Sequence, residues 1–115
     1  MIAAPFRFKG HNSLRYVYSK GKAVRSPSLT IKFIANERRK KPRFSVVISK
    51  KVLKSAVGRN RVRRRIYEYI RLRLPDLQAV HDIVIICTSS ELRTIPADEL
   101  TRQLDAMFEK TELFS

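Results

Sequence analysis

Five arginines occupy the seven positions from Arg59 to Arg65, yet apolar residues recur through and beyond this run. The apolar positions are spaced at i, i+4, i+7 and i+8, which places them on one side of an α-helix: Val62, Ile66, Tyr69 and Ile70. Such a stripe requires a helix that docks one face on a core. The helix is predicted from about Ala56 to Leu74, because Pro75 disfavours helical backbone in the residue before it.

The opposite arc of this helix is almost entirely basic. It carries Asn60, Arg61, Arg64, Arg65, Tyr67, Glu68 and Arg71, with Arg63 at its border. Guanidinium groups pair bidentately with phosphate and stack on bases. An ordinary solvated helix face mixes both signs of charge at i,i+4 spacing, whereas Glu68 is the only acid on this arc. The pattern therefore predicts a polyanionic partner.

The charge of the whole chain is distributed just as unevenly. Residues 1–75 hold 22 Lys and Arg against two acids, whereas residues 76–115 hold three Lys and Arg against eight acids. The two parts carry +20 and −5, which give the net charge of +15. A basic surface on one part of a folded chain is the electrostatic pattern of a nucleic-acid-binding protein. Polybasic membrane anchors are usually disordered or lipidated, and the sequence indicates neither.

The composition predicts one folded domain over residues 1–115, with a basic arm at about residues 1–11. A chain of 115 residues with 43% hydrophobic content is long and apolar enough for a single core. No apolar run approaches the roughly 18 residues of a membrane span, so no membrane partner is expected. The lone cysteine, Cys87, excludes an internal disulfide and a multi-cysteine zinc site. A single thiol fits a reducing, cytoplasmic location.

The periodicity of the chain predicts an α+β fold with helices packed on a small mixed sheet. The other predicted elements are a helix ending at Lys20 before Gly21, a brief strand or a turn within 22–27, alternating strands at 29–33 and 44–48, a buried strand at 82–88 and a last helix starting at Pro96. Residues 36–42 are predicted to form a basic hairpin loop. The strand at 82–88 follows a helix, which predicts a crossover connection, and general chirality alone would make it right-handed.

Ser49-Lys50-Lys51 stands at a strand end and is followed seven residues later by Arg59-Asn60-Arg61. Two further motifs are Leu14-x-x-Val17-Tyr18-x-x-Gly21 and Asp82-Ile83-Val84-Ile85-Ile86. Together these motifs resemble the protein component of bacterial ribonuclease P over nearly the whole chain, and the first pair is the most specific. The resemblance implies an α-β-β-β-α-β-α two-layer sandwich, with a four-stranded mixed sheet and an unusual left-handed crossover around the arginine-rich helix.

The same resemblance implies a function. The chain would be the RNA-binding subunit of an endonuclease that removes the 5′ leader from precursor tRNA. The catalyst would be a partner RNA, and the protein alone would be inactive. Its partners would be this catalytic RNA and the precursor-tRNA leader, with no small-molecule substrate. The required Mg²⁺ would be held mainly by the RNA, so no catalytic or metal-binding side chain is predicted.

Two groups of contact residues follow from the resemblance. The catalytic RNA is expected to contact Lys50, Lys51, Arg59, Asn60, Arg61, Arg64 and Arg65. The leader is expected to lie in a cleft lined by Leu14, Tyr18, Thr30, Lys32, Asn60, Arg63 and Tyr67. Two of these depart from the family pattern. Leu14 stands where an aromatic residue is usual and cannot stack as a ring does, while Tyr67 replaces a common basic residue and offers stacking instead.

Other interpretations of the same residues stay open. A structural RNA-binding protein of the ribosomal type would fit the charge and size equally well. A DNA-binding helix is disfavoured because only Asn60 offers adenine-type readout. A protein nuclease would need His11 and His81 as acid and base, and no motif ties them together. At single positions, Tyr18 fits a half-buried packing role, and Thr30, Lys32, Lys50 and Lys51 fit plain solvent exposure.

Overall fold

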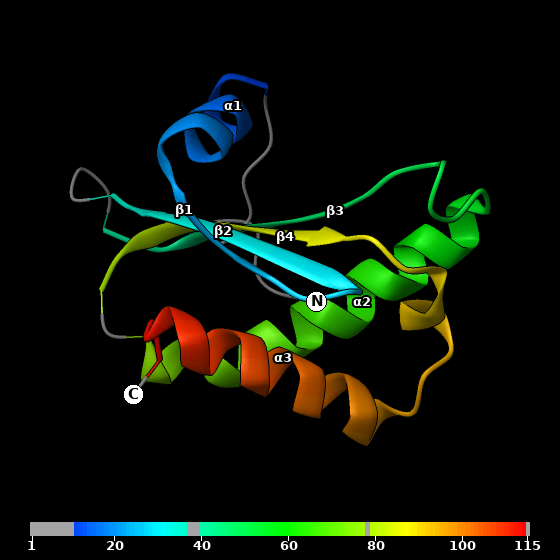
Figure 1. Ribbon diagram of the computed structural model, residues 1–115. Helices are drawn as coiled ribbons and strands as arrows, with labels where there is room; N and C mark the ends of the chain where they lie inside the picture. Colours follow the sequence, from blue (N-terminus) through cyan, green and yellow to red (C-terminus); the bar gives the residue numbers. More distant parts are fainter. Residues whose placement is uncertain (1–10, 37–39, 78, 115) are drawn as a thin grey trace.

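A four-stranded mixed sheet lies at the centre of the molecule, with strand order β1-β2-β4-β3 (Figure 1). The computed structural model describes residues 11–36, 40–77 and 79–114, so the predicted arm lies almost wholly outside the described residues. The main elements are α1 (His11–Lys20), β1 (Lys22–Arg25), β2 (Leu29–Ala35), β3 (Arg43–Ile48), α2 (Ala56–Arg73), β4 (His81–Cys87) and α3 (Ala97–Thr111). Two 3₁₀ helices, η2 (Leu74–Asp76) and η3 (Ser90–Arg93), complete the described chain. The predicted α-β-β-β-α-β-α order is confirmed.

The last strand in the sequence is a central strand of the sheet. β4 pairs antiparallel with β2 and parallel with β3, and α2 connects β3 to β4, so the predicted crossover is confirmed. The predicted hairpin at 36–42 is wrong, because β2 and β3 are not neighbours. The apolar run of β4 is buried on both faces and therefore takes the place between them.

The two faces of the sheet are covered differently, as Figure 1 shows. Beneath the sheet, α2 and α3 form the helical layer of the sandwich, and the main core lies between the layers. Its fully buried side chains include Leu29, Ile31, Phe44, Ile66, Ile83, Ile85 and Leu104. On the opposite face α1 covers only part of the sheet, through a smaller cluster of Val17 and Val84. The same face carries the partly buried apolar side chains of Val47 and Ile86 as well as the polar side chains of Thr30 and Lys32.

Local sequence explains where α2 begins and which side it buries. The Ser55 side chain caps the helix by accepting a hydrogen bond from the Gly58 amide at 3.0 Å. The predicted stripe of Val62, Ile66, Tyr69 and Ile70 is buried, as expected. The predicted exposure of Tyr67 is wrong, since the residue is 6% exposed. β3 is an edge strand, and the Tyr67 hydroxyl accepts a hydrogen bond from its Val46 amide at 3.2 Å.

The C-terminal half of α2 is fastened to α3 by polar groups. Tyr69 donates a hydrogen bond of 2.5 Å to the Asp105 carboxylate, and Arg73 forms an ion pair of 2.5 Å with the same carboxylate. Burial and the hydrogen-bonded carboxylate raise the pKa of Tyr69 well above its usual value. None of the described helices is long and apolar enough to cross a membrane.

Candidate nucleic-acid interface

The position of α1 over the sheet is fixed at its C-terminal end. The chain leaves α1 at Gly21, whose amide donates a 2.8 Å hydrogen bond to the Val17 carbonyl. A Cβ at Gly21 would lie 2.5 Å from the Val17 oxygen and 2.9 Å from the Phe33 oxygen, so glycine is required by close backbone contact with β2. β1 then starts at once and pairs with β2. This turn holds α1 above the polar positions of β2.

Four of the predicted leader contacts lie on this face of the sheet. Thr30 and Lys32 alternate with the buried core positions of β2, and Leu14 packs against the small Val17–Val84 cluster. The Lys32 ammonium lies 5.1 Å from the centre of the Tyr18 ring and 3.4 Å from the Tyr18 carbonyl oxygen. Tyr18 is 38% exposed, and its partial burial raises the pKa of its hydroxyl. The group therefore offers one partly exposed ring beside a cation.

The loop between β3 and α2 presents a second basic group. Ser49 accepts hydrogen bonds of 3.1 Å from both the Val52 and Leu53 amides, which form a tight turn after β3. Lys50 and Lys51, in this turn, are exposed to solvent. Lys54, which the sequence analysis did not single out, is also exposed in this loop. These lysines are placed together by the turn.

Three arginines of α2 donate hydrogen bonds to backbone carbonyls of the protein. Arg59 donates to the carbonyls of Leu53 and Lys54 at 2.9 and 2.8 Å, which pins the lysine loop to the helix. Arg61 donates to the Arg93 carbonyl at 3.1 Å, and Arg65 donates to the carbonyls of Leu92 and Ile95, flanking the same residue. Burial and the neighbouring Arg61 lower the pKa of Arg65, which stays charged.

Other polar residues of α2 turn outward. Asn60 is exposed and accepts a 3.0 Å hydrogen bond from Arg63. Arg64 is exposed, and no side-chain partner of Arg64 occurs in the described part of the chain. Both Arg63 and Arg64 lie in the first three turns of the helix. Their charges are available to an external anion.

Carboxylates neutralise only the C-terminal half of α2. Arg71 pairs with Glu68 at 2.5 Å, and Arg71 lowers the pKa of that carboxyl mainly through their hydrogen bond. Arg73 pairs with Asp105, as described above. The five arginines of the run at 59–65 have no carboxylate within 4.0 Å among the described residues. The unbalanced charge is therefore confined to the first half of the helix.

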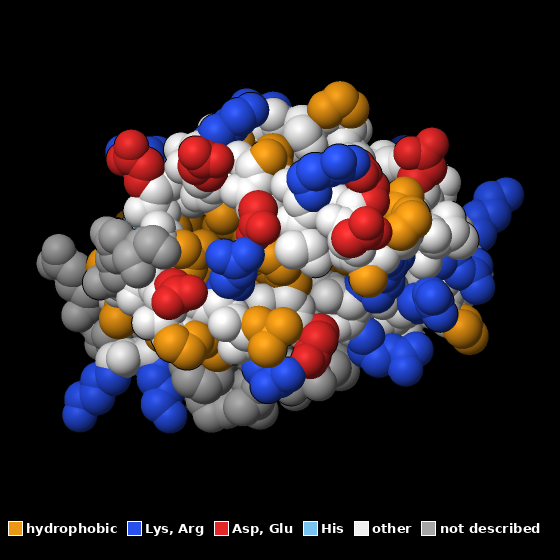
Figure 2. Space-filling model, turned by 90° about the horizontal axis from the view of Figure 1, so that it is seen from below, with side chains coloured by type: hydrophobic (Ala, Val, Ile, Leu, Met, Phe, Trp, Pro, Cys, Tyr) orange, Lys and Arg blue, Asp and Glu red, His pale blue; other side chains and the backbone are white. Residues whose placement is uncertain are grey.

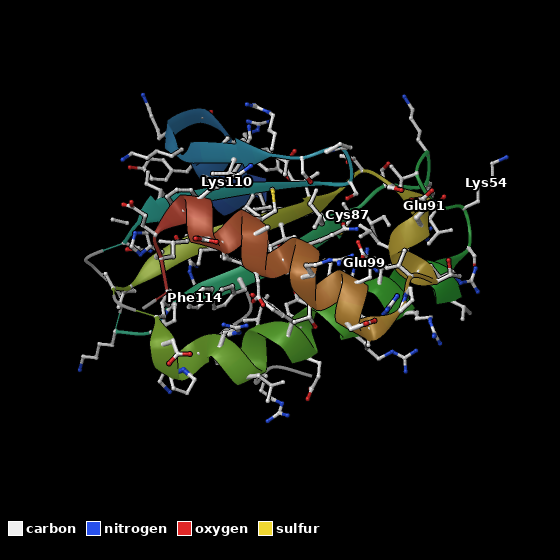
Figure 3. The ribbon with its side chains drawn as sticks, turned by 60° about the horizontal axis from the view of Figure 1, so that its bottom comes forward. Lys54, Cys87, Glu91, Glu99, Lys110 and Phe114 are labelled. Carbon is white, nitrogen blue, oxygen red and sulfur yellow. The ribbon has the colours of Figure 1, made fainter. Side chains whose placement is uncertain are left out.

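The space-filling view agrees with the separation of unpaired and paired charges along α2. Figure 2 shows Lys and Arg side chains gathered at the lower right, the end at which Figure 1 places the start of α2. Acidic side chains are scattered among basic, apolar and other side chains over the middle and upper part of the visible face. Figure 3 places Lys54 and Glu91 at this end, whereas Phe114 lies towards the other end.

The sheet register brings the two basic groups near one another. Cys87 ends β4 and pairs with Leu29 at the start of β2 and with Ile48 at the end of β3. Thr30 is thus one residue from the sheet end at which the lysine loop begins. The positive charge of Arg63 acts on the Cys87 thiol, although burial dominates and raises the pKa of that thiol to about 12. We call the basic surface at this end the basic rim; it is formed by the exposed Lys50, Lys51, Lys54, Asn60 and Arg64 and the partly exposed Arg63.

Several predicted residues lie elsewhere. Tyr67 is in the core and is not exposed for stacking. His81 starts β4, where its ring lies 6.3 Å from that of Phe33, centre to centre. The side chain of His11 and the loop residues Arg38 and Arg39 lie outside the described structure. No group of three or more His, Cys, Asp or Glu side chains that could hold a metal occurs among the described residues.

Known proteins resemble this chain in both sequence and fold. The sequence profile of the family described as Ribonuclease P matches residues 3–112. The chain belongs to the ribonuclease P protein family. A ribonuclease P protein component from Desulfosudis oleivorans is 35% identical, with 92% of this chain and 90% of the relative covered. One from Chloroflexus aurantiacus is 34% identical, with 89% of this chain and 74% of the relative covered.

Solved structures of ribonuclease P proteins share the fold. That of Staphylococcus aureus superposes with a TM-score of 0.85 over 96% of this chain and 98% of the other, at 21% identity. That of Thermotoga maritima gives a TM-score of 0.76 over 90% of this chain and 96% of the other, at 20% identity. The predicted α+β ribonuclease P fold is thereby confirmed. As a ribonuclease P protein component, the chain is an RNA-binding subunit of a tRNA 5′-processing ribonuclease.

Proposed function

We propose that the basic rim binds the catalytic RNA and that the α1 face of the sheet binds the 5′ leader of precursor tRNA. The observation that carries this proposal concerns α2: its arginines without a carboxylate partner lie in the run at 59–65, beside the lysine loop, whereas Arg71 and Arg73 are paired. A folded surface with several exposed cations that are not paired with carboxylates attracts phosphate strongly. Contacts to the RNA backbone would fix the position of the protein on the catalyst.

The α1 face supports the second half of the proposal. A single-stranded leader presents unstacked bases, and such bases stack on exposed aromatic rings. Tyr18 offers that ring, and Lys32 at 5.1 Å offers a cation for the adjoining phosphate. Thr30 would add a hydroxyl, while Leu14 would contribute only apolar contact. Arg63 and Asn60, at the neighbouring sheet end, would continue the path towards the basic rim.

The arginines divide into two roles in this proposal. Arg64 faces the RNA directly, whereas Arg59, Arg61 and Arg65 each satisfy backbone carbonyls of the protein. A guanidinium has five donors, so these three can bind phosphate with the groups that remain. Tyr67 has no part in leader binding here, because its ring is buried.

We assign the binding of the required Mg²⁺ to the partner RNA. Two candidate carboxylates are already engaged, since Glu68 pairs with Arg71 and Asp82 pairs with Arg43. These side chains do not fit a Mg²⁺ site, and no step is assigned to a protein-bound metal. We place the protein in the cytoplasm, where a precursor tRNA and a reduced, buried Cys87 are both expected.

Reconstituted cleavage tests this function. Protein stripped of RNA should cleave no precursor tRNA, and addition of a cognate catalytic RNA with Mg²⁺ should produce the trimmed 5′ end. His81→Ala should leave the cleavage rate nearly unchanged, because its ring packs at the base of a strand. Cleavage by demonstrably RNA-free protein, lost in His81→Ala, would contradict the proposal and favour a protein nuclease.

A further inference from the structure

The 3₁₀ helix η3 is fixed against the first half of α2 from two sides. Inside, Leu92 is 1% exposed and packs into the main core. Outside, Arg61 donates to the Arg93 carbonyl, and Arg65 donates to the carbonyls of Leu92, one residue before Arg93, and Ile95, two residues after it. The backbone of Arg93 is therefore held in place, and the start of its side chain is fixed with it.

The Arg93 side chain reaches back over the first turn of α2. A Cβ built on Gly58 would lie 3.0 Å from Arg93 Nη1 and 3.2 Å from Arg93 Cζ. Contacts this short mean that the guanidinium lies against the Cα of Gly58, in the space that a side chain would fill. Gly58 directly precedes Arg59 and Asn60, so Arg93 is placed at the edge of the basic rim.

The charge of Arg93 is not used within the described protein. No carboxylate lies within 4.0 Å of it among the described residues, and its side chain has no described hydrogen-bond partner. Arg102, also in the C-terminal third, provides the contrast, because it is paired with Glu99 on α3. Arg93 and Arg102 carry the same charge in the same acidic part of the chain, but only Arg93 borders the basic rim.

Resting on the function proposed above, we infer that Arg93 is a phosphate-binding residue of the RNA interface, seated on Gly58. It comes from the part of the sequence whose net charge is −5, so charge patterning along the chain does not reveal it. The ligand is the sugar–phosphate backbone of the partner RNA, because a partly exposed guanidinium without an acidic partner recognises a phosphate. Arg61 and Arg65 position it by binding the backbone around it.

Three matched substitutions test this inference with the catalytic RNA as the probe. Arg93→Ala should weaken binding roughly 3- to 10-fold at moderate salt and reduce the salt slope of log K by about 0.7–0.9, the value for one lost phosphate contact. Arg102→Ala should change the affinity less than about twofold, since a remote surface charge is screened. Arg93→Lys should keep most of the slope. The melting temperature of Arg93→Ala should stay unchanged, because Arg61 bonds to its backbone carbonyl.

Arg64→Ala separates failure of this inference from failure of the proposed function. Loss of affinity in Arg64→Ala and in Arg93→Ala, but not in Arg102→Ala, supports the inference. Loss in Arg64→Ala, with Arg93→Ala equal to Arg102→Ala, overturns the role of Arg93 and leaves the basic rim standing. No loss in Arg64→Ala or Arg93→Ala would show that the basic rim is not the interface, and both proposals would fall.

Discussion

Individual side chains on the basic surface differ in role even when they share a residue type. Arg64 is free to meet an anion, Arg65 ties α2 to η3, and Arg73 is neutralised by Asp105. Helical periodicity separates an inner from an outer arc, but it does not say which outer arginine finds a carbonyl elsewhere in the chain. That information depends on the path of residues 90–95, which the helix sequence does not contain. For the same reason, Arg93 and Lys54 could not be predicted from the helix sequence as residues of the basic surface.

The prediction most specific to leader binding concerns Tyr18. Tyr18→Ala should reduce affinity for precursor tRNA by about 1–3 kcal/mol, the value of one stacked base, and affect mature tRNA much less. Titration of both tRNA forms into the assembled ribonucleoprotein measures the difference. Tyr16→Ala is the control, because Tyr16 is also exposed on α1 but is not one of the predicted leader contacts. An equal loss for both tRNA forms would assign Tyr18 to packing.

Cys87 makes stability depend on pH in the alkaline range. Burial raises the pKa of its thiol to about 12, above roughly 8.5 for an unfolded cysteine. Only the unfolded chain ionises between these values, so this stabilising contribution is complete below pH ~8.5 and is lost as pH rises. The loss at pH 10 should be roughly 2 kcal/mol. Denaturation of wild type and Cys87→Ala from pH 8 to 10 measures it; equal slopes would contradict it.

At the scale of elements, one face of α2 packs in the core and stabilises the fold, and the opposite face carries the proposed RNA contacts. Its sequence predicted the start at Ala56 correctly and the end within one residue of Arg73. Ser55 and Pro75 supply those boundaries locally. The inward turn of Tyr67 was not predictable from α2 alone, because it depends on an unpaired amide of the edge strand β3. The hairpin between β2 and β3 was predicted wrongly for a related reason. The alternation of apolar and polar residues in each strand does not specify which strand lies beside it in the sheet.

Two apolar residues of α2 test the assignment of its faces. Ile66 is fully buried, and Ile66→Ala should lower the free energy of unfolding by roughly 2–5 kcal/mol. Leu72 is 63% exposed, and Leu72→Ala should change it by about 0.5 kcal/mol or less. Chemical denaturation followed by circular dichroism compares the two variants. Similar losses would mean that the inner and outer faces have been confused.

At the scale of the whole molecule, the uneven charge produces electrostatic repulsion that a bound anion would relieve. A net charge of +15 opposes compaction, and the repulsion arises within residues 1–75, which carry +20 and include the basic rim, whereas residues 76–115 carry −5. The α+β class, the element order and the crossover followed from periodicity, because each depends on local runs such as 82–88. The leader and RNA contacts followed only from the family motifs, and they remain predictions.

Anion binding should therefore stabilise the free protein. Sulfate should raise the melting temperature more than chloride at equal ionic strength, with a response that saturates as the phosphate-binding sites fill. A thermal scan at increasing sulfate measures this. Saturation distinguishes site binding from the general salting-out effect of sulfate, which grows with concentration. Identical curves for the two anions would indicate simple charge screening.

The salt dependence of binding to the catalytic RNA tests the central claim most directly. Each neutralised phosphate contributes about −0.7 to −0.9 to the slope of log K against log salt, so five contacts would give roughly −3.5 to −4.5. Filter binding of the purified protein across monovalent salt concentrations gives the slope, and Arg102→Ala should leave it unchanged. A slope of this size, reduced by Arg64→Ala, is expected if the basic rim holds the RNA. A flat response would show that the RNA does not bind there.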